Sequence, residues 1–182
     1  SPVRKLLSAV RKEAFDSHTY KHTTMGFFED VEAMPEQVAY GEQFFKQFYK
    51  PEYVSLVIVG DVEPAATMAM VEKHWGNWQR GDFVNDITPE PKQQAAKYVH
   101  EKFDGLPGHW LLVSYKGTDW QPKKKDRAAL DLISELYFSN NSALYQELVV
   151  DKQLASQMFN YNPETKDAGL RHVFIKVNEE KD

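Results

Sequence analysis

The six histidines are the first candidates for metal-dependent chemistry in this sequence. A zinc hydrolase needs neutral imidazoles and a carboxylate around the metal, with one position left open for water. On a helix this need produces His-Glu-x-x-His or the inverted His-x-x-Glu-His, in which both histidines share one face. None of the six histidines lies in either pattern. They are His18, His22, His74, His100, His109 and His172. We therefore predict no metal ligands in this chain.

His18 and His22 are the one pair with a helical spacing of four residues. They could chelate a metal only on a helix, and the threonines at 19, 23 and 24 are poor helix formers. A third ligand is also missing from the neighbouring sequence. This segment is predicted to be a structured loop.

Carboxylates are the next candidates, for general acid and base work. Glu29, Asp30, Glu135 and Glu147 each lie on the polar side of a predicted helix, where a carboxylate is usually solvated. A Gly-x-Ser-x-Gly motif and a phosphate-binding glycine-rich loop are both absent from the sequence. Because cysteine is absent too, thiol nucleophiles and disulfides are excluded, and the cellular compartment stays open. We predict no catalytic or substrate-binding residue.

Composition places the chain among ordinary globular proteins. Its 182 residues suit one domain or two small ones, and 42% hydrophobic with 27% charged residues excludes a disordered chain. The net charge of −5 argues against a nucleic-acid partner, since the short basic run at residues 123–125 fits a solvated helix end. The longest apolar run, residues 54–59, is far shorter than the roughly 20 residues of a membrane span.

Periodicity predicts a first part, residues 1–78, that holds three main helices and one strand. Apolar residues at helical spacing predict a helix ending near Phe15, and a polar turn follows at residues 16–20. A short helical stretch comes after Gly26, and Pro35 opens a longer helix that Pro51 ends. The continuous β-branched run 54–59 predicts a strand buried on both faces. Pro64 then opens a helix that Gly76 ends.

Residues 79–96 contain glycine, two prolines and no sustained period, which predicts a linker between two domains. The second domain, residues 97–182, shows strand patterns at 97–103, 110–115, 154–161 and 169–177 and helical patterns at 123–138 and 142–152. A glycine- and proline-rich turn at 104–108 joins the first two strands. The predicted fold class is α+β, with helices packed on one face of a sheet.

Two ordered sets of motifs resemble one known family. The first set is His18-Thr19-Tyr20, Gly26, the aromatic segment around Lys50-Pro51-Glu52-Tyr53, the strand ending Gly60-Asp61, and the helix ending His74-Trp75-Gly76. The second is Ser142-Ala143-Leu144-Tyr145-Gln146-Glu147-Leu148. Together they are similar to the pitrilysin/insulinase zinc metallopeptidases downstream of the zinc motif. Thr19 and Tyr53 depart from the family, which usually has Pro and often Asn at these positions.

The resemblance implies that residues 1–78 end one family domain and residues 97–182 form most of the following homologous α/β sandwich, the inactive C-terminal domain. The zinc motif and its downstream Glu would precede Ser1, so zinc is implied for the complete protein and not for this chain. The implied function is the non-zinc-binding portion of a zinc metalloendopeptidase, which supplies chamber wall and interdomain packing and is inactive alone.

The implied partners are a peptide or unfolded polypeptide substrate, the zinc-motif part of the same chain and a homologous partner half. An alternative is a non-catalytic scaffold or partner subunit, as the family's likeness to respiratory-complex core subunits allows. A third alternative is an unrelated α+β binding module. A bacterial cell envelope or periplasmic location is one option among several compartments.

The family's clamshell has two homologous halves, one of which bears the zinc. Two positions indicate which half this chain resembles. In the partner half, an Arg and a Tyr seven residues later bind the substrate backbone near the zinc. The aligned positions here are Val149 and Ser156, which supply neither a charge nor a phenol. The resemblance thus implies the zinc-bearing half or an inactive member.

Overall fold

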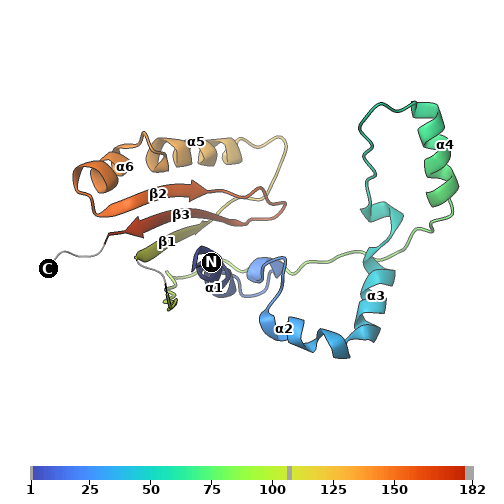
Figure 1. Cartoon of the computed structure of the whole chain (residues 1–182), viewed down its shortest axis with the longest axis horizontal. Helices are drawn as coiled ribbons and strands as arrows, with labels where there is room; N and C mark the ends of the chain where they lie inside the picture. The colour runs from blue at the N-terminus through green and yellow to red at the C-terminus, as the bar shows by residue number, and fades with distance from the viewer. Residues whose placement is uncertain (1, 106–107, 179–182) are drawn as a thin grey trace. The chain divides into compact units, whose positions relative to one another are not determined.

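The computed structural model describes residues 2–105 and 108–178, and the chain divides into two compact units (Figure 1). Unit 1 comprises the chain up to Met25 together with the chain from Thr88 onward, and unit 2 is Gly26–Ile87. The predicted domain boundaries, with a linker at residues 79–96, stay a prediction.

Unit 1 is built on a three-stranded antiparallel sheet with the order β1-β3-β2. The strands are β1 (His109–Lys116), β2 (Ala155–Tyr161) and β3 (Leu170–Val177). Leu112 lies opposite Phe174 in β3, and Phe159 of β2 lies opposite the same residue from the other side. The α+β class and three of the predicted strands are therefore confirmed.

Helices lie on both faces of this sheet (Figure 1). Helix α5 (Asp126–Phe138) faces the odd-numbered residues of β3, since Arg171 donates to Asp131 and Ser134 on that helix. Helix α1 (Pro2–Ala14) lies against the even-numbered residues, because Lys116, opposite Leu170 in the ladder, stacks over Phe15 just after α1. The prediction that helices cover one face is wrong in this respect, because the sequence pattern assigned α1 to another domain.

The second helical segment of unit 1 starts at a serine cap. The side chain of Ser142 accepts a hydrogen bond from the backbone N–H of Tyr145, at 3.1 Å, and Ser142 is buried. Helix α6 (Ala143–Tyr145) continues into a π-helical turn, Gln146–Asp151. The predicted helix at 142–152 is confirmed, and its N-cap explains the serine in the family motif.

Unit 2 is helical in the described structure. It contains α2 (Phe28–Ala33), α3 (Val38–Phe48) and α4 (Pro64–Trp75), with short 3₁₀ turns at Met34–Glu36 and Pro51–Tyr53. Prolines stand in the first turn of both 3₁₀ turns and of α4, where the missing N–H costs nothing. The predicted helices are confirmed, except that the longer one begins at Val38 and Pro35 lies in the 3₁₀ turn before it.

Two predicted strands are wrong. Residues 54–59 and 97–103 form no ladder with any strand of the described structure, although both have strand-like sequences. A strand forms only when a neighbouring backbone satisfies its N–H and C=O groups, and local pattern cannot supply that neighbour. The predicted turn at 104–108 includes residues 106 and 107, which lie outside the described residues. No described helix is both long and apolar enough to cross a bilayer.

Candidate functional site

The histidines that sequence analysis singled out do not converge. Across residues 2–105 and 108–178, no group of three or more His, Asp or Glu side chains is placed to hold a metal ion. His18 and His22 lie on either side of a single 3₁₀ turn, Thr19–Lys21, so they are not on a common helix face. The donors present here therefore do not fit a zinc site.

His18 instead stabilises the turn that contains it. Its Nδ1 accepts the backbone N–H of Tyr20 at 3.0 Å, and its Nε2 lies 3.5 Å from Oδ2 of Asp167. The ring is 5% exposed and lies 4.2 Å from the ring of Tyr20. The backbone N–H of Asp167 donates to the Tyr20 hydroxyl at 3.2 Å. These contacts hold the turn to the loop between β2 and β3.

A second polar group in unit 1 is the Glu90 cluster, which comprises Glu90, Lys116 and the backbone amides of residues 16–18. The carboxylate accepts the N–H groups of Asp16, Ser17 and His18 at 2.8, 3.0 and 2.9 Å. Burial raises the pKa of Glu90, but these bonds and the charge of Lys116 outweigh burial and lower the pKa to about 2. Glu90 therefore stays ionised and acts as a structural anion.

Lys116 completes this cluster at the end of β1. Its Nζ lies 3.5 Å from Oε1 of Glu90 and 3.4 Å from the ring centroid of Phe15, a cation–π geometry. Burial lowers the pKa of Lys116, and the charge of Glu90 opposes that effect. The pair thus joins β1, the end of α1 and the segment after residue 88.

A serine–histidine pair lies inside unit 1. Nδ1 of His172 is 2.8 Å from Oγ of Ser114, directly across the β1–β3 ladder. His172 is 1% exposed, and burial, with the nearby charge of Arg11, lowers its pKa to about 4. The imidazole is neutral and is packed beside the rings of Tyr161 and Phe174. We assign His172 to the core, because a substrate cannot reach a side chain that is 1% exposed, whereas Ser114 is half-buried.

The predicted solvated carboxylates lie on the surface. Glu29, Asp30 and Glu135 are exposed, and Glu147 pairs with Lys152 at 2.5 Å. Val149 is half-buried in the π-helical turn, and Ser156 is exposed, with its Oγ 3.4 Å from the carbonyl oxygen of Lys176.

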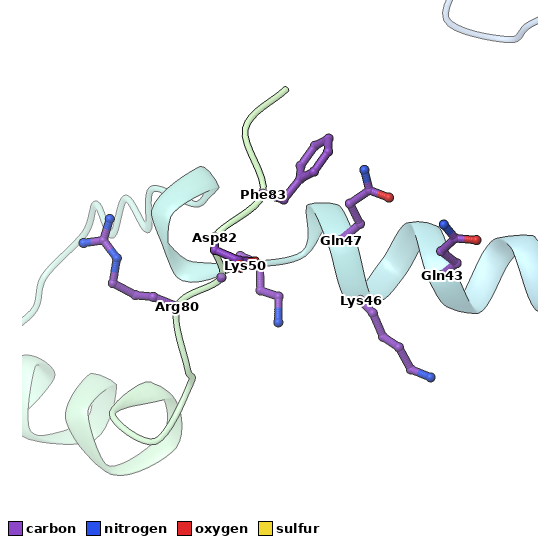
Figure 2. Close-up of a pocket in the computed structure, with 8 residues that line it drawn as sticks. Gln43, Lys46, Gln47, Lys50, Arg80, Asp82 and Phe83 are labelled. Atoms are coloured by element: carbon purple, nitrogen blue, oxygen red, sulfur yellow. The ribbon is translucent and has the colours of Figure 1, made fainter. Parts of the chain in front are cut away.

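A pocket of about 590 Å³ in unit 2 brings together residues that sequence analysis did not select. It is lined by the polar side of α3 and by residues 80–83. Figure 2 shows Lys46 extending from one side of α3 and Gln43 and Gln47 from the other, with Lys50 on the segment that follows the helix. The available signal was the spacing of 43 and 47, which places these two residues on one face of the predicted helix.

The fold and its polar clusters define an α+β protein whose buried ionisable groups hold its own segments together. The chain belongs to the peptidase M16 inactive domain family, whose profile matches residues 42–181. The resemblance to the zinc metallopeptidases drawn from the sequence motifs is thereby confirmed.

Two curated relatives share this region. The zinc protease PqqE of Helicobacter pylori is 31% identical over 174 residues, which is 93% of this chain and 38% of that protein. The uncharacterized zinc protease YmfH of Bacillus subtilis is 25% identical over 170 residues, 89% of this chain and 39% of that protein. This chain therefore spans about two fifths of the length of these relatives.

A solved structure has the same fold. The crystal structure of a protease from Helicobacter pylori superposes with a TM-score of 0.79 at 30% identity, covering 98% of this chain and 43% of that one. The likeness therefore extends over nearly the whole chain.

Proposed function

We propose that this chain is the non-zinc-binding portion of a zinc-dependent metalloendopeptidase, supplying chamber wall and interdomain packing. Its relatives are named zinc proteases, and the described residues of this chain hold no cluster that fits the metal. Zinc is thus assigned to the remainder of the complete protein. The substrates of the complete protease would then be peptides or unfolded polypeptides.

One observation carries the proposal: the apolar segment 54–59 is exposed. Val57 is 79% and Val59 90% exposed, and no described strand pairs with the segment. A run this rich in Val, Leu and Ile suits a central strand with neighbours on both edges and cover on both faces. Exposed contiguous apolar surface marks an interaction site in a soluble protein. The segment is therefore suited to pair with strands of another part of the protease.

The energy available for that pairing is substantial. Full burial of a Val, Leu or Ile side chain is worth about 1.5–3 kcal/mol. Burying the exposed fractions of the five apolar residues of segment 54–59 gives on the order of 5–10 kcal/mol before ordering costs. This gross amount works against the costs of ordering the segment and of associating two domains.

A two-part reconstitution tests the proposal. The coding sequence upstream of Ser1 is expected to encode His-x-x-Glu-His, and that polypeptide is expressed separately and mixed with this chain. We expect zinc-dependent hydrolysis of a quenched-fluorescent peptide library only in the mixture. Tight stoichiometric zinc or chelator-sensitive turnover in this chain alone would contradict the proposal. An upstream sequence without the motif would instead support the scaffold alternative.

A matched pair of variants checks the role of segment 54–59. Val57→Lys is expected to weaken association with the zinc-motif polypeptide strongly, because a charge would have to be buried. Val84→Lys makes the same change at a valine of unit 2 that is equally exposed, at 78%, and is expected to leave association unchanged. Equal binding of both variants, measured by isothermal titration calorimetry, would show that segment 54–59 is not the interface.

A further inference from the structure

Helix α5 carries a second apolar face, which is directed away from the sheet. Ser134 is buried on the sheet side, where its hydroxyl accepts a hydrogen bond from Arg171. Helix side chains two positions apart point about 200° apart, so Leu132 and Leu136 lie on the opposite side from Ser134. They are 65% and 68% exposed, and Tyr137 beside them is 60% exposed. The helix therefore has an uncovered apolar stripe as well as the face that packs on the sheet (Figure 1).

A hollow of about 330 Å³ lies at the C-terminal end of α5. It is lined by Glu135, Phe138 and residues 139–141, together with Phe159 and Asn160 of β2. Glu135 forms no ion pair with any other residue that the structure describes. Its carboxylate is therefore available to a group from outside this chain.

The hollow has the electrostatic character of a cation site. The end of a helix carries partial negative charge on its unpaired carbonyls, and the last turn of α5 contains Glu135 but no basic residue. No backbone N–H from elsewhere in the described chain bonds the carbonyl oxygens of residues 135–138. The rings of Phe138 and Phe159 add aromatic surface, which attracts cations at its faces. An ammonium or guanidinium group would therefore be stabilised here.

The stripe and the hollow together define the occupant. Leu132 and Leu136 are one helical turn apart, a spacing into which the apolar side chains of a second helix pack. A second copy of α5 supplies no cation, because its one basic residue, Arg127, is already paired with Asp131 and Glu164. The relatives extend well beyond this region, since the chain spans 38% and 39% of them. The remainder of the complete protein is therefore the favoured source of the partner helix.

We propose that the outer face of α5, with the hollow at its C-terminal end, docks a basic amphipathic helix from the remainder of the complete protein, and that a Lys or Arg side chain of this helix enters the hollow. That the remainder is a further domain of the same protein rests on the proposed function. The surface is separate from segment 54–59 of unit 2 and makes no use of zinc.

Hydroxyl-radical footprinting of the complete protein and of this chain alone tests whether the stripe is covered. Tyr137 is the reporter. If its exposed fraction falls from 60% to about 10%, as in the core of an interface, it should be oxidised about sixfold more slowly in the complete protein. As a control, both proteins unfolded in urea should be oxidised at Tyr137 at equal rates.

Charge reversal tests the hollow. In the complete protein, Glu135→Arg is expected to restore the oxidation of Tyr137 to at least about half its rate in this chain alone, because like charges would meet across the interface. In this chain alone the same substitution places a cation at a helix C-terminus, so the melting temperature should not fall. The control Glu164→Arg, at a carboxylate whose side chain is 89% exposed, should leave the protection of Tyr137 unchanged.

Four outcomes would overturn the inference. They are equal oxidation of Tyr137 in both proteins, protection that Glu135→Arg leaves intact, a lower melting temperature of this chain with Glu135→Arg, and sedimentation of this chain as a dimer that protects Tyr137. The third would assign Glu135 to the stability of α5 itself, and the fourth would make a second copy the occupant. Protection of Tyr137 in a complete protein without zinc-dependent hydrolysis would reject the proposed function alone. Hydrolysis with an uncovered α5 would reject this inference alone.

Discussion

The substitution Glu90→Gln tests whether one carboxylate ties the turn at residues 16–18 to the rest of unit 1. Both carboxylate oxygens accept backbone N–H groups, and an amide would turn its own NH₂ toward at least one of those donors. The fall of the Glu90 pKa from 4.5 to about 2 corresponds to about 3 kcal/mol of stability at neutral pH. With the side chain 14% exposed, little of this is screened, and we expect a loss of about 2–3 kcal/mol.

Urea denaturation followed by tryptophan fluorescence measures this loss, with Trp110 and Trp120 as probes in unit 1. The lowered pKa means that the contribution of Glu90 is complete above pH 4.5 and disappears as the pH falls to about 2. The gap between wild type and variant should close over the same interval. Glu164→Gln, at an 89% exposed side chain, is the control and should stay within about 0.5 kcal/mol. A gap under about 0.5 kcal/mol for Glu90→Gln, or a gap that is independent of pH, would refute the reasoning.

Three further changes have defined outcomes. His172 is neutral in the folded protein, because its pKa is lowered from 6.5 to about 4. Unit 1 should therefore lose up to about 3 kcal/mol of stability as the pH falls through that range. His172→Gln should remove this part of the pH dependence in urea titrations. Ser142→Ala should cost about 1 kcal/mol in thermal unfolding through loss of the N-cap, while Ser142→Thr should recover part of it; equal melting of all three proteins would contradict the cap. Arg171→Met should cost about 1–2 kcal/mol of stability, because Asp131 and Ser134 lose their hydrogen-bond donor. An unchanged stability in urea would show that the Arg171–Asp131 ion pair contributes nothing measurable.

The helices and the three sheet strands could be predicted because their signals are local. Pro64 and Ser142 mark helix starts through backbone groups only a few residues away. Segments 54–59 and 97–103 carried the same kind of strand pattern as β3, and yet they form no strand here. The difference lies in the partner strand, which the residues of a segment do not encode.

The Glu90 cluster was outside the reach of sequence reasoning for a similar reason. Glu90 lies in a segment without period, and it accepts N–H groups 72 to 74 residues away. His172 likewise looked like an ordinary member of an alternating strand, and only the ladder register places it opposite Ser114. By contrast, the sequence could be searched directly for a zinc motif, because the histidines of such a motif lie close together on one helix.

The long separation between the turn at 16–18 and Glu90 has a kinetic consequence. During synthesis α1 leaves the ribosome before the sheet that covers its apolar face, which begins only at His109. Docking α1 therefore closes a long loop, and folding generally becomes slower as the sequence separation of such contacts grows. The apolar stripe of α1 stays available to chaperones throughout that interval, so refolding of unit 1 from denaturant should be slower than formation of the local helices of unit 2.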